Sequence, residues 1–257
     1  MARPHIVTIA RFTLFEAVRT RLPWLFITVL ALILGAAYFM QQLAITESTR
    51  LQIAFSAAAT RFAAVFLLSL HVITSMVREF NDKGLELTLS FDLPRAHYVL
   101  GRLLGFALIA LLIALIALLP QLLLATPIAA LQWGLSPALE LVIMAALSLF
   151  CIVTFTQLMP AASFVFGFYL LARALTAIRM ISDTPLTGGD ALSHQVIALL
   201  VDALSLVLPA LERFAQTAWL IEHSASWTVI GANALQAVIY IALIGAAATF
   251  DFYRRNL

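Results

Sequence analysis

The polar residues with the clearest chemical pattern lie in one charged stretch, residues 78–105, between two long apolar runs. Gly84 follows two charged residues there and suits a turn that needs a positive φ. Leu85, Leu89 and Leu93 recur at four-residue spacing, so a short helix would present one apolar ridge. Such a ridge packs either on a separate cytoplasmic protein or on the chain's own helices. The pattern therefore indicates a helix that binds a protein surface.

Signals for catalysis are absent from the sequence. It has no Gly-x-x-x-x-Gly-Lys-Ser/Thr loop to hold nucleotide phosphates, no His-Glu-x-x-His and no Gly-x-Ser-x-Gly. Membrane-embedded enzymes usually need paired carboxylates or a Ser–His pair, whereas Glu140, at the outer start of one span, is almost the only acid in the apolar segments. We therefore expect no catalysis and no bound cofactor in this chain.

Soft metal ligands occur in two apolar runs, as His71 with Met76 and Met144 with Cys151. These side chains can bind copper, but methionine and a lone cysteine on apolar helices also serve as packing residues. The prediction is that the chain holds no metal. With a single cysteine, it forms no intrachain disulfide.

A few other polar residues interrupt the apolar runs. Arg61 is expected near the outer interface, where it can snorkel towards water. Arg173 lies deeper, so it should either face a wet route or pair with an outer acid. Asn233, Gln236 and Tyr240 share one helix face. That face either bonds a neighbouring helix or lines a polar route.

The amino-acid composition of the chain indicates that these residues lie in a membrane protein. The chain has 257 residues, of which 63% are hydrophobic and 11% charged, and its mean hydropathy is +1.03. Soluble domains carry about 25% charged residues, so this chain has too little polar surface for a water-facing fold. We predict an all-α polytopic membrane protein with one domain, 1–257, and six transmembrane helices. The predicted spans are residues 22–43, 57–77, 100–125, 138–159, 161–178 and 229–250.

The basic residues predict the topology. An amphipathic interfacial helix over residues 3–21 precedes the first span. With six spans and both termini in the cytoplasm, ten of the fifteen cations lie in cytoplasmic segments, as the positive-inside rule requires. Residues 179–228 then form an outer segment. Its apolar residues 196–208 are too short to span, and they predict an amphipathic or re-entrant helix.

The order of residues in the charged stretch is specific. It opens with Arg-Glu, continues with a glycine, a leucine-rich helix, a proline and an arginine, and ends with a Gly-Arg pair at the third span. The residues that carry this order are Arg78, Glu79, Gly84, Glu86, Leu89, Pro94, Arg95, Tyr98, Gly101, Arg102 and Gly105.

With this order the chain resembles the permease subunits of type-two ATP-binding-cassette transporters, an exporter-like class. Two details depart from the usual pattern: Arg95 follows Pro94 directly, and Arg102 replaces the commoner lysine. The N-terminal interfacial helix, the tight turn between the fourth and fifth spans, the Leu208-Pro209 pair and the aromatic-Arg-Arg ending are also similar to the family.

The resemblance implies a cytoplasmic coupling helix in the 78–99 loop that docks on a separate ATPase. The residues implied in that contact are Arg78, Glu79, Asp82, Gly84, Glu86, Leu89, Pro94 and Arg95. It further implies a multi-pass protein of the bacterial inner membrane, working as a homodimer or a close heterodimer with two ATPase subunits that bind ATP and Mg²⁺. A periplasmic or extracellular accessory protein is a further possible partner, and nucleic acid is not one.

The translocation route predicted for such a permease is lined by Arg173, His71, Asn233, Gln236 and Tyr240. The alternative function is a membrane scaffold that recruits a cytoplasmic partner through the same loop without transport.

Overall fold

The computed structural model describes residues 3–43, 47–82, 94–183, 199, 203–204, 208–222, 224 and 226–254. Every regular element within these residues is helical, which confirms the all-α prediction for this part of the chain. Six of the helices are long and apolar enough to cross a membrane, as predicted. They are α2 (Leu22–Leu43), α3 (Ser48–Asn81), α5 (Arg95–Leu124), α6 (Pro127–Phe155), α7 (Leu158–Asp183) and α10 (Trp227–Arg254).

The helices run past the apolar stretches that identify them. Only α2 has the predicted bounds, and the other five begin earlier than the predicted spans. The largest difference is at α6, which contains Pro137 in its interior and starts at Pro127. A proline within a membrane helix is tolerated because neighbouring helices satisfy the freed backbone groups. The apolar run therefore underestimates the length of the helix.

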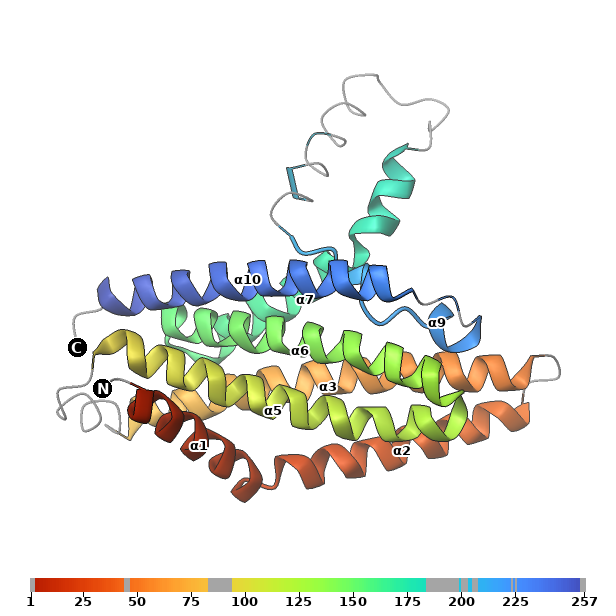
Figure 1. Cartoon of the computed structure of the whole chain (residues 1–257), viewed down its shortest axis with the longest axis horizontal. Coiled ribbons are helices and arrows are strands. Elements are labelled where there is room, and N and C mark those ends of the chain that lie inside the picture. The colour runs from red at the N-terminus through yellow and green to blue at the C-terminus, as the bar shows by residue number, and fades with distance from the viewer. Residues whose placement is uncertain are drawn as a thin grey trace.

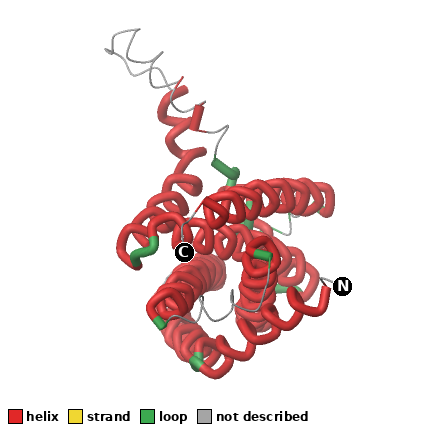
Figure 2. Tube along the Cα trace, turned by 90° about the vertical axis from the view of Figure 1, so that its left-hand side faces the viewer, coloured by secondary structure: helices red, strands yellow, loops and turns green. Residues whose placement is uncertain are grey.

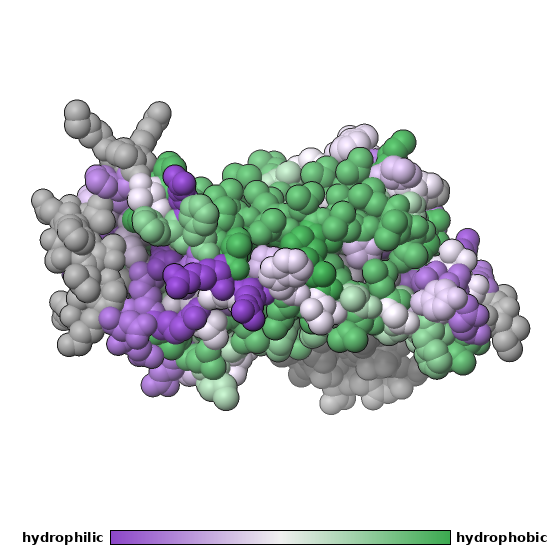
Figure 3. Space-filling model, turned by 90° about the horizontal axis from the view of Figure 1, so that it is seen from below, coloured by the Kyte–Doolittle hydropathy of each residue, from purple (hydrophilic) through white to green (hydrophobic). Residues whose placement is uncertain are grey.

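The six helices lie side by side along the long axis of the molecule (Figure 1). Both ends of the described chain, the start of α5 and the end of α3 lie at the same end of the bundle, which we call the proximal end. Seen from below, a band of apolar residues separates polar groups at the two ends (Figure 3). This arrangement is that of a multi-pass membrane protein.

The N-terminal helix α1 (Arg3–Arg19) packs on the first turns of α5. Its inner face consists of small residues, Ala10, Thr13 and Ala17, all buried. The facing positions of α5 are Gly101 and Gly105. Glycine at this spacing lets two helices approach closely. The small-residue pair thus serves the contact with α1.

After α7 the chain comes back to the distal part of the bundle in a short, mostly irregular stretch. The last turns of α7 project from the bundle, as the view along the bundle shows (Figure 2). The chain then returns to the bundle through η1 (Leu211–Arg213) and α9 (Ala218–Ile221) before α10 begins. Most of the helix expected over residues 196–208 lies outside the described residues.

Replacing Gly105 tests the packing of α1 on α5. A β-carbon at Gly105 would lie 2.5 Å from Cβ of Thr13, so Gly105→Ala forces α1 outwards. We expect a loss of about 1–3 kcal/mol in the free energy of unfolding, as for other overpacked contacts. Thermal unfolding in detergent measures it. Gly35→Ala on α2 is the control, because nothing lies within 4 Å of its new methyl group. Equal melting temperatures for both variants would contradict the contact.

Candidate functional site

Arg102 on α5 is the centre of a polar network at the proximal end. Its Nη1 donates to Thr13 Oγ1 at 3.0 Å and to Glu16 Oε2 at 3.3 Å, both on α1. Its Nη2 pairs with the Glu79 carboxylate on α3. The side chains of Arg102 and Glu79 are each only 12% exposed. One guanidinium therefore joins α3 and α5 to the N-terminal helix α1, more than 80 residues away in the sequence.

Glu16 extends this network to a second arginine. Its Oε1 accepts a hydrogen bond from Ser75 at 2.9 Å and lies 3.6 Å from Nη2 of Arg78. Buried ions are stable only when paired and hydrogen-bonded, and a charge-assisted bond is about twice as strong as a neutral one. The paired charges of α1, α3 and α5 therefore fix the position of the end of α3.

Helix α10 joins the same region through aromatic packing. The buried Tyr98 ring on α5 lies 6.0 Å from the guanidinium carbon of Arg102. On its other side, Tyr98 stacks on Phe252 with ring centroids 5.6 Å apart. Arg95 donates to the carbonyl of Tyr253 at 3.4 Å. Both the start of α5 and the end of α3 are thus held in place.

The predicted coupling residues divide into three groups in the structure. Arg78, Asp82 and Pro94 are exposed at the two helix ends that flank the loop, and Arg95 is half-buried. Glu79 faces inward to Arg102, which suits a positioning role. Gly84, Glu86 and Leu89 lie outside the described residues.

A second polar cluster lies at the distal end, around the fully buried Glu140 of α6. Nη1 of Arg173 on α7 lies 3.5 Å from Glu140 Oε1 and donates to the carbonyl of Leu211 at 2.8 Å. The sequence left two interpretations of Arg173, which were contact with a wet route and pairing with an outer acid. In the structure Arg173 pairs with the acid Glu140. Arg61 on α3 donates to the carbonyl of Ala215 at 2.7 Å instead of extending to water.

The return segment, residues 211–215, is held by four helices. Besides the two arginines, Ser136 on α6 accepts a hydrogen bond from the Ala215 amide at 2.9 Å. Asn233 on α10 donates to the carbonyl of Arg213 at 3.1 Å. An irregular backbone at this depth is stable only when its polar groups are satisfied by protein or water. The four side chains provide hydrogen-bond partners for backbone groups of this segment.

The predicted route residues do not form one lining. Arg173 and Asn233 both bind the return segment. Gln236 and Tyr240 are half-buried further along α10. His71 lies nearer the proximal end of α3, where it lines a groove against α2. The structure therefore separates His71 from the other four.

The soft ligands His71, Met76, Met144 and Cys151 are all buried. The last three belong to one hydrophobic cluster, which favours their interpretation as packing residues. Within the described residues, no group of three or more His, Cys, Asp or Glu side chains is arranged to hold a metal ion.

A groove of about 550 Å³ runs between α3 and α7 in the distal half. Aromatic contacts hold its two walls together: Phe62 lies 6.4 Å from Tyr169, and Phe66 stacks on Phe166 at 4.8 Å. Arg61 and Arg173 also line it, so this lateral surface combines aromatic rings with two cations. The rings on α3 and α7 carry no sequence signal that distinguishes them from lipid-facing residues.

No family model and no curated protein matches this chain.

Replacing Arg102 tests the proximal network. Arg102→Gln leaves Glu79 without its cation, and we expect a loss of about 3–5 kcal/mol in the free energy of unfolding. The double variant Glu79→Gln/Arg102→Gln should recover part of this loss, because no buried charge remains. Arg50→Gln is the control, since its pair with Glu47 is about 60% exposed and contributes at most about 1 kcal/mol. Strictly additive losses in the double variant would refute the pairing.

Replacing Arg61 and Arg173 tests the distal cluster. Arg61→Met/Arg173→Met removes both guanidinium donors to the return segment, and we expect the segment to detach. Maleimide labelling of Glu212→Cys, in a Cys151→Ser background, should then become faster than in the chain with both arginines. Arg213→Met is the control, because its side chain is exposed and Asn233 bonds only to its backbone carbonyl. Unchanged labelling would show that the apolar contacts of Leu211 and Phe214 are sufficient.

Proposed function

We propose that this chain is the membrane permease subunit of an ATP-driven transporter of the ATP-binding-cassette type. It works as a dimer and is coupled to separate ATPase subunits through residues 78–102. One observation carries the proposal: the loop at residues 82–94 joins α3 and α5, and the polar network around Arg102 ties both flanks of this loop to α1.

This arrangement suits the transmission of force. A push on the loop displaces the ends of α3 and α5 together, because Arg102 and Glu79 hold them and Gly105 packs α1 against them. Helix α3 has 34 residues, which is about 51 Å of helix. Its distal half carries Arg61, which binds the return segment. A rigid helix of this length carries a proximal displacement to the distal cluster.

The groove between α3 and α7 supports a dimer. Arginine side chains that face lipid are unstable, and they occur against protein or water-filled cavities. Arg61 and Arg173 line an open groove here. In the proposed dimer a second copy covers this face. The two arginines, whose guanidinium groups also bond within the chain, then lie at the wall of a route between the two copies.

The distribution of cations supports the proposed topology. The described arginines on the proximal parts of the helices are Arg3, Arg11, Arg19, Arg21, Arg78, Arg95, Arg102 and Arg254. Those in the distal half or on the projecting end of α7 are Arg50, Arg61, Arg173, Arg179 and Arg213. The positive-inside rule then assigns the proximal end and both termini to the cytoplasm, as in a bacterial inner-membrane protein. ATP and Mg²⁺ are bound by the partner subunit.

The second candidate is a scaffold that uses the same loop to recruit a cytoplasmic protein. The half-exposed Arg78 and the exposed Asp82 and Pro94 suit such recruitment equally well. Only the transporter requires that the partner protein hydrolyse ATP at a rate that depends on the loop.

The test is purification of the tagged chain from its native membrane, followed by an ATP hydrolysis assay and native mass measurement of the eluate. We expect two copies of the chain with two ATPase subunits. Leu89→Asp should weaken ATPase association about tenfold or more, equivalent to about 1.4 kcal/mol, with membrane insertion unchanged.

Arg50→Gln, at the distal end of the bundle, is the matched control and should leave association unchanged. A partner without ATP turnover that is lost with Leu89→Asp would favour the scaffold. An eluate that contains the chain alone would refute both functions.

A further inference from the structure

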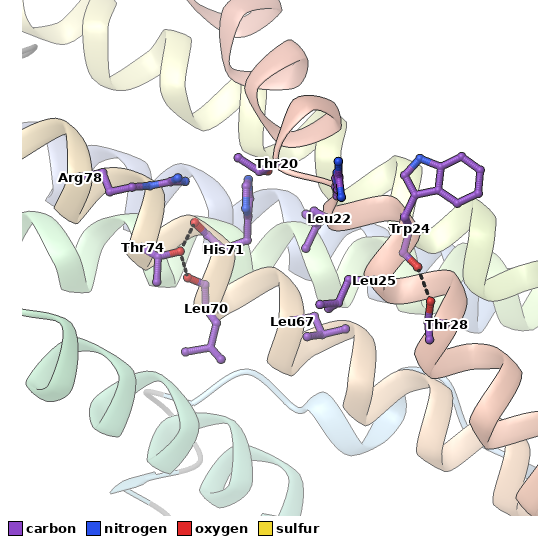
Figure 4. Close-up of a pocket in the computed structure, with 11 residues that line it drawn as sticks. Thr20, Leu22, Trp24, Leu25, Thr28, Leu67, Leu70, His71, Thr74 and Arg78 are labelled. Atoms are coloured by element: carbon purple, nitrogen blue, oxygen red, sulfur yellow. Dashed lines mark hydrogen bonds between the residues drawn. The ribbon is translucent and has the colours of Figure 1, made fainter.

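A groove of about 650 Å³ lies at the corner between α1 and α2, against α3 (Figure 4). The corner is sharp because Arg21, between the two helices, has a φ of 61°. Helix α2 has 22 residues, or about 33 Å of helix, close to the hydrocarbon thickness of about 30 Å. Its first residue, Leu22, therefore marks the edge of the hydrocarbon. The groove straddles that edge.

Both walls of the groove change from polar to apolar in the same direction. On α3, Arg78, Thr74 and His71 precede Leu70 and Leu67 on the way into the bilayer. On the opposite wall, Thr20 and Arg21 precede Leu22 and Leu25. Trp24, 68% exposed beside them, has the side chain most typical of the membrane interface. The groove is thus polar at its proximal end and mainly apolar further into the bilayer.

The polar part of the groove has unused hydrogen-bonding capacity. His71 is only 7% exposed, its ring points towards Thr20, and its Nε2 has no hydrogen-bond partner among the described residues. Arg21 makes no ion pair with the described part of the chain. Two arginines line the groove, and no acidic residue does. A buried imidazole without a partner calls for a ligand or water.

We propose that this groove binds one anionic phospholipid of the proximal leaflet. Its phosphate lies between Arg21, Arg78 and His71, and one acyl chain lies along Leu25, Leu67 and Leu70. A free phosphate would leave the apolar wall uncovered. Basic pockets between membrane helices recognise anionic headgroups in this way. The inference is independent of any ATPase partner.

The experiment is native mass spectrometry of the full chain, purified in detergent and freed of lipid. It is titrated with dioleoylphosphatidylglycerol or, as the neutral match, dioleoylphosphatidylcholine. We expect tighter binding of the first phosphatidylglycerol molecule. Arg21→Gln should weaken it about fivefold, as expected for one cation near a headgroup. Arg78→Gln should act in the same direction, with its melting temperature measured because it also pairs with Glu16.

Arg19→Gln is the matched control, since Arg19 is exposed at the end of α1, two residues before Arg21, and does not line the groove. It should leave the affinity unchanged. An equal loss in Arg19→Gln and Arg21→Gln would indicate diffuse attraction and overturn the site. Equal affinity for the two lipids would also overturn it. Displacement of phosphatidylglycerol by inorganic phosphate would assign the groove to a free anion and refute the lipid.

Discussion

The pairing of Arg102 with Glu16 and Glu79 is the interaction on which the proximal half of the molecule depends. A buried guanidinium is stable only when its charge is paired, and both Nη groups of Arg102 find their acceptors on α1 and α3. Gly101 and Gly105 allow that approach, because any side chain there would collide with Ile9 or Thr13. The ion pairs and the close packing together hold the proximal parts of α1, α3 and α5 against one another. Residues 82–94, which connect α3 to α5, therefore begin and end at fixed positions.

The distal end uses arginine differently. There Arg61 and Arg173 donate to backbone carbonyls of the return segment, and the buried Glu140 pairs with Arg173. A chain that turns back at this depth needs such donors, since lipid supplies none. Helix α3 takes part in both clusters, through Glu79 and Arg61. The two polar regions, although far apart, therefore share one rigid element.

Apolar length was sufficient to predict the six helices, because crossing a bilayer imposes a minimum run that few soluble helices reach. The spacing of Gly101 and Gly105 is typical of a close helix contact, but spacing on one helix does not specify that α1 is the partner. Glu140 and Arg173 were both visible as intramembrane charges, and their pairing was one of two alternatives. The bond of Arg61 to Ala215 was beyond prediction: a carbonyl carries no sequence signal, and 154 residues separate the two groups.

Arg78 connects the lateral groove to the proximal network, because it lines the groove and also faces Glu16. The Glu16 carboxylate is shared between Ser75, Arg78 and Arg102. In the proposed lipid complex the phosphate competes with Glu16 for the half-exposed Arg78, and Glu16 keeps its contacts with Ser75 and Arg102. The proposed lipid site and the contact between α1 and α5 thus share one carboxylate, that of Glu16.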